Sequence, residues 1–106
     1  MSTRKREYKT TTLAEAVSLI EDGSTVAIGG SPIHRHPMAM IFEIVRQKKR
    51  SLTLLGWNNS IDMDLLLGAG CVSAIETSDV GMAMLGLAIK YRRAVESGTL
   101  KITEQS

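Results

Sequence analysis

Apolar residues in this chain of 106 residues fall into two alternating patterns, short uninterrupted runs and longer stretches with a helical period. The first helical stretch begins after Thr12, which has capping-box spacing to Glu15. Its apolar positions lie three or four residues apart and share one face: Leu13, Ala16, Val17 and Ile20. We expect this helix to end at the pair Asp22–Gly23, because glycine commonly follows the last helical residue.

The short apolar runs predict four strands, at residues 26–28, 52–55, 72–75 and 100–102. Helical patterns lie between them, from residue 37 to the polar segment 46–51, from 61 to 67 and from 81 to 96. Alternation of this kind is typical of an α/β fold with an open parallel sheet and flanking helices. Because the run 26–28 is short and uniformly apolar, we expect a strand that is covered on both faces.

The loop between residues 28 and 37 is the first candidate for a binding site. In open α/β sheets, ligands bind outside the carboxyl ends of the strands. The candidates are the glycines and polar side chains of this loop: Gly29, Gly30, Ser31, His34, Arg35 and His36. Glycines let the backbone approach a ligand, and they equally suit a plain tight turn, so the spacing fits both interpretations. The loop lacks the glycine spacing of a dinucleotide fold and the lysine of a P-loop, which disfavours NAD and ATP.

Two further turns follow predicted strands and are expected near the same edge. The first, residues 56–60, offers Trp57 and Asn58 as side chains that contact a ligand. The second, residues 76–79, offers Glu76 and Asp79, which can serve in acid–base chemistry or cap the helix expected from residue 81. Glu104, at the end of the last strand, is a further acidic candidate.

Composition narrows the classes of function. A net charge of +2 is too small to indicate a nucleic-acid partner, and no apolar run is long enough to span a membrane. The single cysteine, Cys71, has small apolar neighbours and is expected to be a buried inert thiol in a reducing cytoplasm. His34 and His36 are too few to form a metal site, which needs three or four ligands, so we expect a solvent-facing pair and no metal.

Three blocks of the sequence carry a family resemblance: Thr12 to Gly30, His34 to Gln47 followed by Leu52 to Leu54, and Tyr91 to Glu104. The first includes Asp22-Gly-Ser-Thr-Val-Ala-Ile-Gly-Gly, and the second opens with His34-Arg-His-Pro-Met-Ala-Met. The third opens with Tyr91-Arg-Arg-Ala-Val-Glu-Ser-Gly. In this order and spacing they resemble the α subunit of family I CoA-transferases, especially the glutaconate CoA-transferase-like branch. The resemblance implies a CoA-transferase-like, ribose-phosphate-isomerase-like fold that is incomplete in this chain.

The resemblance also implies a reaction shared between two chains. In this family a glutamate on the β-type partner attacks an acyl-CoA, forms an acyl-glutamyl anhydride and then carries CoA as a thioester. That glutamate lies in a Ser-Glu-Asn-Gly-type motif, which this sequence lacks, so the chain alone is expected to be inactive. The α half contributes the glycine loop and part of the acyl pocket. The substrates are then an acyl-CoA and a carboxylic acid, with coenzyme A as co-substrate and no permanently bound cofactor.

Two alternatives stay open beside the transferase. An acyl-CoA hydrolase of the same fold, including a C–C bond hydrolase, uses other residues in place of the glutamate. A non-catalytic, truncated domain acts only through self-association. Family members continue well past residue 106, so a truncated gene, a separately encoded fragment and a segment prepared for expression all stay open. We expect a flexible tail at 1–10 and the N-terminal part of an α-type domain at 11–106.

Incomplete covering of the sheet predicts self-association. The last strand, 100–102, would present an open edge, and the stretch from Met82 to Ala88 is rich in apolar residues that suit core or interface packing. Closed two-fold pairing is the commonest solution, so we expect a homo-oligomer, most simply a dimer.

Overall fold

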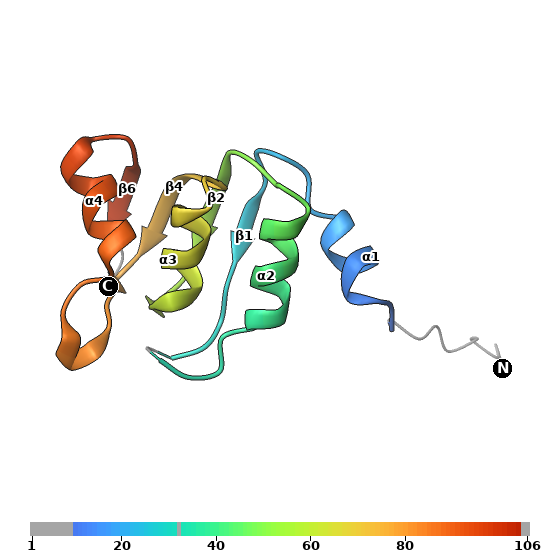
Figure 1. Ribbon diagram of the computed structural model, residues 1–106, viewed down its shortest axis with the longest axis horizontal. Helices are drawn as coiled ribbons and strands as arrows, with labels where there is room; N and C mark the ends of the chain where they lie inside the picture. Colours follow the sequence, from blue (N-terminus) through green and yellow to red (C-terminus); the bar gives the residue numbers. More distant parts are fainter. Residues whose placement is uncertain (1–9, 32, 105–106) are drawn as a thin grey trace, which may run out of the picture.

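The computed structural model describes residues 10–31 and 33–104, which build a parallel sheet and a layer of helices (Figure 1). Most of the predicted 1–10 tail, Pro32 and the last two residues lie outside this range. The elements in chain order are α1 (Leu13–Ser18), β1 (Thr25–Ala27), α2 (Met38–Arg46), β2 (Leu52–Leu55), β3 (Asn58–Asn59), α3 (Ile61–Gly68), β4 (Val72–Thr77), β5 (Asp79–Val80), the 3-10 helix η1 (Ala83–Leu85), α4 (Ile89–Ser97) and β6 (Lys101–Glu104).

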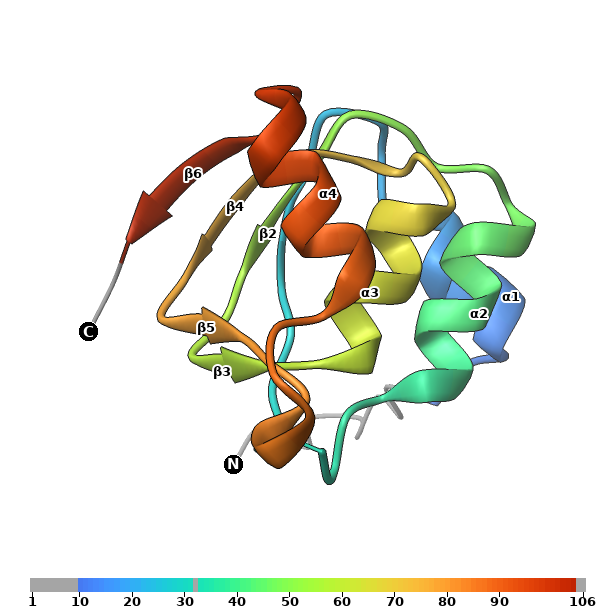
Figure 2. The ribbon, with the colours of Figure 1, turned by 60° about the vertical axis from the view of Figure 1, so that its left-hand side comes forward.

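The main sheet confirms the predicted parallel α/β arrangement. Its four strands lie in the order β1-β2-β4-β6, and every neighbouring pair is parallel. Because successive strands are always added on the same side, each connecting helix returns over the same face. Figure 2 shows the four α-helices together on one side of the sheet.

Only the face toward these helices carries the core. Val26, Leu54, Ile75 and Ile102 form one row across the four strands on that face. The neighbouring row consists of Ala27, Leu55, Glu76 and Thr103, and no helix covers its face within residues 10–31 and 33–104. The expectation that strand 26–28 is covered on both faces is therefore wrong. β1 is an edge strand whose residues Thr25 and Ala27 are exposed.

The first helix begins as predicted and ends earlier. The Thr12 hydroxyl accepts a hydrogen bond of 3.1 Å from the Glu15 backbone N–H, and α1 stops at Ser18. The segment expected to end the helix pairs elsewhere, because Gly23 N–H donates to the Arg50 carbonyl at 3.0 Å and Asp22 Oδ1 accepts from Arg50 N–H at 2.7 Å. These tertiary bonds hold residues 22–23 in a turn against the β2 side of the molecule.

The region after β4 differs most from the sequence-based expectation. β4 continues to Thr77, so Glu76 and Thr77 belong to a strand instead of a turn. The next residues form β5, which pairs with β3 in a small second sheet that the sequence pattern did not indicate. The helix expected from residue 81 is a short 3-10 turn, and α4 begins only at Ile89. Backbone bonds from Gly81 N–H to Asn59 O and from Ala88 N–H to Val80 O replace the helical ones.

The other helices and strands agree with the sequence pattern. Pro37 precedes α2, whose Ile41 and Ile44 are buried against the sheet. α3 ends at Gly68, and Gly98 terminates α4 with a left-handed φ of 72°. None of the helices that the structure describes has the length and apolar character needed to cross a membrane.

Candidate functional site

The carboxyl ends of the parallel strands bring the predicted site loops to one edge of the sheet. The connection after β1 lies beside the connection after β2, because Ile28 N–H donates to Leu55 O at 2.9 Å. The connection after β2 contacts the one after β4 through Ser78 N–H and the Trp57 carbonyl, 3.1 Å apart. Figure 2 shows these connections together with β3 and β5. The order of the described strands does not reverse, so this edge lacks the crevice of a topological switch point. We call the surface formed by the three connections after β1, β2 and β4 the ledge.

The glycine loop is a closed turn on this ledge. Ser31 and His34 exchange two backbone hydrogen bonds of 2.9 and 2.8 Å. Gly30 has a φ of 116°, and a Cβ there would lie 2.9 Å from the Arg35 carbonyl and against the His36 ring. Gly29 faces open space, with no atom within 4 Å of its Cβ position. Gly30 is thus required by the packing of the turn, and Gly29 is the glycine that leaves the backbone accessible.

The two histidines have different environments. His34 is exposed, as expected. The His36 side chain is only 2% exposed, and its Nδ1 lies 2.9 Å from the Gly29 carbonyl and 3.4 Å from Asp62 Oδ2. The prediction of a solvent-facing pair is therefore wrong for His36, because its ring fills the space beside Gly30. Arg35 lies between them, exposed and at a left-handed φ of 63°.

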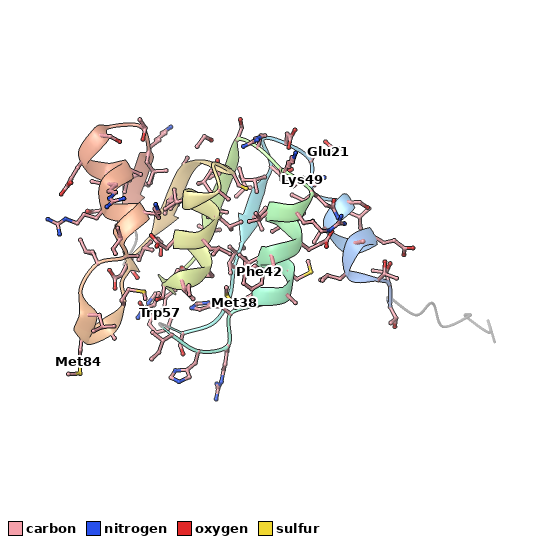
Figure 3. The ribbon with its side chains drawn as sticks, viewed as in Figure 1. Glu21, Met38, Phe42, Lys49, Trp57 and Met84 are labelled. Atoms are coloured by element: carbon pink, nitrogen blue, oxygen red, sulfur yellow. The ribbon has the colours of Figure 1, made fainter. Side chains whose placement is uncertain are left out.

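Trp57 and Asn58 occupy the same edge after β2. The Trp57 side chain is 64% exposed and lies beyond the sheet at the end of the strand (Figure 3). Asn58 is half-buried, and its Oδ1 has no hydrogen-bond partner among the described residues.

The acidic candidates lie apart from the glycine loop. Glu76 lies on the uncovered face, two strands away from Ala27 in the same row. Burial raises the pKa of the Tyr91 hydroxyl, and the Asp79 and Glu104 carboxylates raise it further, which places both acids close to α4. The expected capping role of Asp79 is wrong, because Asp79 belongs to β5 and the next helical turn, η1, begins only at Ala83.

Four buried polar residues beneath the loops did not stand out in the sequence: Asn59, Ser60, Asp62 and Thr77, each 3% exposed or less. Their sequence signal is weak, because polar residues at a strand end or in the first turn of a helix are usually exposed caps. Only the tertiary structure places them under three loops at once.

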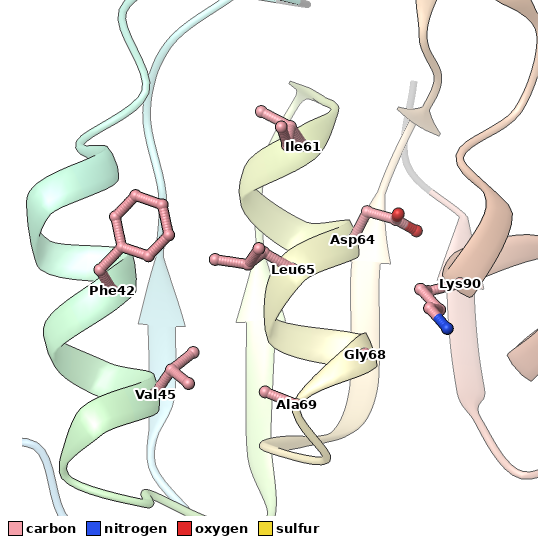
Figure 4. Close-up of a pocket in the computed structure, with 8 residues that line it drawn as sticks. All are labelled: Phe42, Val45, Ile61, Asp64, Leu65, Gly68, Ala69 and Lys90. Carbon is pink, nitrogen blue, oxygen red and sulfur yellow. The ribbon is translucent and has the colours of Figure 1, made fainter.

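Three surface cavities of about 560, 360 and 470 Å³ lie elsewhere. In the first, Phe42 and Val45 of α2 face Ile61 and Leu65 of α3 and Ala69, which follows that helix (Figure 4). The second and third flank residues Leu87 and Arg92 at the start of α4. No predicted ligand-binding residue of the glycine loop or the Trp57 turn lines any of these cavities.

Cys71 is buried as predicted, with 1% of its surface exposed. Burial raises the pKa of its thiol, and the nearby Arg50 charge opposes this effect only in part. The neutral thiol is a poor nucleophile. In the part of the chain that the structure describes, no three His, Cys, Asp or Glu side chains are close enough to hold a metal ion.

Two solved structures are similar to this one along nearly the whole chain. Glutaconate coenzyme A-transferase from Acidaminococcus fermentans superposes with a TM-score of 0.86 and 32% identity, over 93% of this chain and 32% of that one. A variant of the decarboxylase AibA/AibB superposes with a TM-score of 0.82 and 32% identity, over 91% of this chain and 38% of that one.

Sequence comparison gives the same family. The A-type subunit of 3-oxoadipate CoA-transferase from Pseudomonas knackmussii is 40% identical over 99 residues, which are 90% of this chain and 35% of that protein. The A-type subunit of the Acidaminococcus fermentans glutaconate enzyme is 33% identical over 100 residues, 92% of this chain and 31% of that protein. The chain spans about a third of the length of these relatives. The family model described as Coenzyme A transferase matches residues 10–105, and the chain therefore belongs to the coenzyme A transferase family.

Proposed function

We propose that this chain is an α-type part of a CoA-transferase that moves CoA between an acyl-CoA and a carboxylic acid in the cytoplasm. The family match across residues 10–105, with two relatives named as A-type subunits of CoA-transferases, carries the proposal. In this proposal a β-type partner supplies the nucleophilic glutamate, as the family resemblance implies, and the 106 residues contain no Ser-Glu-Asn-Gly-type motif. CoA is then a co-substrate instead of a resident cofactor.

The ledge at the carboxyl edge supplies the substrate contacts in this proposal. Backbone N–H groups of Gly29 and Gly30 approach a carbonyl or carboxylate oxygen, and the exposed Gly29 gives them access. Ser31 contributes its hydroxyl, because its N–H donates to the His34 carbonyl. Arg35, beside the exposed His34, pairs with a carboxylate of the acid. Trp57 and Asn58 contact the acyl-CoA from the neighbouring loop. Both relatives are named after dicarboxylic acids, glutaconate and 3-oxoadipate, which suits an arginine that holds the second carboxylate.

Reconstitution with a β-type partner tests the reaction. We expect no transfer from acetyl-CoA to glutaconate by the chain alone, because the nucleophile is absent. We expect transfer when a β-type partner with the Ser-Glu-Asn-Gly-type motif is added, and its loss when that glutamate is changed to alanine. Turnover by the chain alone, or none in the mixture, contradicts the proposal. Release of free CoA without transfer would indicate the hydrolase alternative.

Arg35→Ala tests the role of the arginine in the reconstituted complex. We expect the KM for glutaconate to rise by about tenfold, with little change for acetate, because a charge-assisted pair contributes about 1.5–3 kcal/mol. Arg93→Ala is the matched control, since Arg93 is exposed on α4 away from this edge. An equal change in KM for both acids would show that Arg35 does not hold the second carboxylate.

We further propose that the isolated chain self-associates through the apolar loop, defined as residues 82–89. This stretch is expected to pack in a core or interface, and Ala88 is buried, but four large apolar side chains of the loop are exposed: Met84 by 100%, Leu85 by 84%, Leu87 by 52% and Ile89 by 62%. Met84 lies at the tip of the loop and points away from the sheet (Figure 3). In a two-fold dimer the apolar loop of one copy packs against the same loop of the other, because a two-fold interface uses the same patch on both copies.

Sedimentation equilibrium of the chain at micromolar concentration tests this association. We expect a dimer, and we expect Met84→Ser combined with Leu85→Ser to shift it to monomer, because those side chains are exposed in the single chain. Leu19→Ser is the control, since Leu19 is 81% exposed and directly follows α1, which lies at the opposite end of the helical layer (Figure 1). A monomeric parent chain, or a dimer that the double variant leaves intact, contradicts the proposed surface.

A further inference from the structure

A buried polar cluster lies directly beneath the three loops of the ledge. It consists of Asn59, Ser60 and Asp62 after β2, Thr77 at the end of β4, and His36 from the loop after β1. Burial of so many polar groups is tolerated only when their hydrogen bonds are made within the protein. The contacts of each group therefore show which parts of the chain the cluster holds together.

The Asp62 carboxylate is surrounded by donors. Its Oδ1 accepts from the Ser60 backbone N–H at 2.8 Å, and its Oδ2 accepts from Asn59 Nδ2 at 2.8 Å. His36 Nδ1 lies 3.4 Å from the same Oδ2 and 2.9 Å from the Gly29 carbonyl. Because both of these neighbours are acceptors, His36 Nδ1 carries a proton. A wholly buried carboxylate thus reaches from the start of α3 to the glycine loop.

Asn59 links the other two loops to this carboxylate. Its Nδ2 also approaches the Ile28 carbonyl, at 3.4 Å, and its Oδ1 lies 3.2 Å from the Thr77 hydroxyl. That hydroxyl also lies 3.1 Å from the Trp57 carbonyl, and it has a single proton to donate to these acceptor oxygens. The Gly56 backbone packs closely against the Asn59 amide, and a Cβ added to Gly56 would lie only 2.8 Å from Asn59 Cγ.

A local capping role does not account for these contacts. Asp62 lies in the first turn of α3, where an aspartate commonly binds backbone N–H groups, and its Oδ1 does so. Its Oδ2 points the other way, toward Asn59 and His36. Ser60, at the N-cap position, makes no side-chain cap bond, and its hydroxyl lies 3.2 Å from Met82 Sδ. The second oxygen therefore serves the loops instead of the helix.

We propose that Asn59 and Asp62 are positioning residues that hold the three loops of the ledge in one arrangement before any substrate binds. A loop can leave this arrangement only by uncovering or unpairing a buried polar group, which couples movement of each loop to the others. That these loops contact the substrate rests on the proposed function. The coupling between the loops rests only on contacts within this chain, so an experiment can reject either claim without rejecting the other.

Thr77→Val tests the coupling across strands. The substitution keeps the shape of the side chain and removes the hydroxyl that joins β4 to Asn59. We expect hydrogen exchange of the Ser31 and His34 amides, which are paired across the glycine loop, to accelerate by about tenfold. Thr77→Ser should restore exchange to within about twofold of the parent chain. Thr103→Val, an exposed threonine on β6, should leave it unchanged.

Asp62→Asn tests the carboxylate itself. An amide keeps the size of the side chain, yet in either orientation its NH2 faces a donor, from Ser60 on one side or from Asn59 and His36 on the other. We expect a changed ¹⁵N resonance of His36 Nδ1 and faster loop exchange. Asp64→Asn is the control two residues away, because its one bond, from the Tyr91 N–H, can be accepted by an amide oxygen.

The two experiments decide the proposal even if Asp62→Asn fails to fold, since Thr77→Val retains the packing of β4. Exchange at Ser31 and His34 that stays unchanged in Thr77→Val, while amides next to residue 77 exchange faster, would overturn the coupling. Failure of CoA transfer in a chain whose loops are coupled would reject the proposed function and leave the positioning role intact.

Discussion

At the residue scale, the glycine loop depends on the fit between one glycine and one histidine. Gly30 has a left-handed φ and leaves room for the ring of His36, which is buried by the loop above it. Gly29, its neighbour in sequence, has neither constraint. A pair of adjacent glycines therefore performs two different tasks, close packing at one position and backbone exposure at the other.

Gly30→Ala should destabilise the chain by about 1–3 kcal/mol, because alanine is strained at this φ and its methyl group meets the His36 ring. Gly29→Ala is the matched control and should stay within about 0.5 kcal/mol of the parent, since its Cβ position is open. Urea unfolding followed by circular dichroism measures both. Equal stability of the two variants would show that His36 does not occupy the space beside Gly30.

Glu43 makes the stability of the folded chain depend on pH in the acidic range. The hydrogen bond from Arg46, with a second from Gln47, lowers the pKa of the Glu43 carboxyl from 4.5 to about 2. Because the folded-state pKa is depressed, the stabilisation is present above pH 4.5 and is lost as the pH falls toward 2. Gln47 also donates to the Ala14 carbonyl at 2.9 Å, so this group connects α2 to α1.

In Glu43→Gln, the free energy of unfolding should fall less steeply than in the parent as the pH drops from 4.5 to 2. Below that range, where Glu43 of the parent is protonated, the two chains should respond to pH alike. Urea unfolding at a series of pH values measures the slope. Glu96→Gln is the control, because its ion pair with Arg92 is exposed on both sides and such pairs contribute little. A parental slope in Glu43→Gln would contradict the depressed pKa.

At the scale of elements, α4 shows how a helix can begin without a local signal. Its N-cap residue, Ala88, makes no side-chain cap bond. Asp64 of α3 instead accepts a hydrogen bond of 2.8 Å from the Tyr91 N–H in the first turn of α4. A carboxylate at this end also interacts favourably with the helix dipole. The cap thus lies 27 residues away in sequence.

Asp64→Ala should destabilise the chain by about 0.5–2 kcal/mol and fray the first turn of α4, because the Tyr91 N–H loses its acceptor. Amide exchange at Tyr91 and Arg92 should accelerate more than exchange in α2. Asp64→Asn retains an acceptor and should lie between the parent and the alanine variant. Unchanged exchange at Tyr91 in Asp64→Ala would mean that α4 is capped in another way.

At the scale of the whole molecule, the described part of the chain covers only one face of the sheet. The sequential strand order places α1 to α4 together, and the opposite face of the described strands carries small or polar residues with Leu55 among them. Parallel sheets are ordinarily covered on both faces. The proposed dimer uses the apolar loop, which leaves this sheet face free.

Leu55→Lys should therefore change stability by no more than about 1 kcal/mol and leave the sedimentation behaviour unchanged, since Leu55 is 36% exposed on the uncovered face. Leu54→Lys is the contrasting variant, because Leu54 is wholly buried and a charge there should prevent folding. Loss of the dimer in Leu55→Lys would show that self-association uses the sheet face instead of the apolar loop.

Local pattern was sufficient for those elements whose ends are set by neighbouring residues. Thr12 begins α1 and Pro37 precedes α2, each as predicted. The order of strands and helices also identified the parallel α/β class, and the family resemblance was confirmed over residues 10–105. The loops that form the ledge were foreseen for the same reason, because each follows an apolar run.

The sequence by itself determined the α/β class, the elements of the main sheet with their connecting helices, and the family, since hydrophobic period, caps and turn residues act between near neighbours. Tertiary structure decided that β1 is an edge strand, that residues 79–88 form β5 and the apolar loop, and that His36 is buried. It also gathered Asn59, Asp62 and Thr77 beneath the loops. These outcomes depend on hydrogen bonds and packing between segments far apart in sequence, and a polar residue has no local pattern that distinguishes an exposed cap from a buried partner.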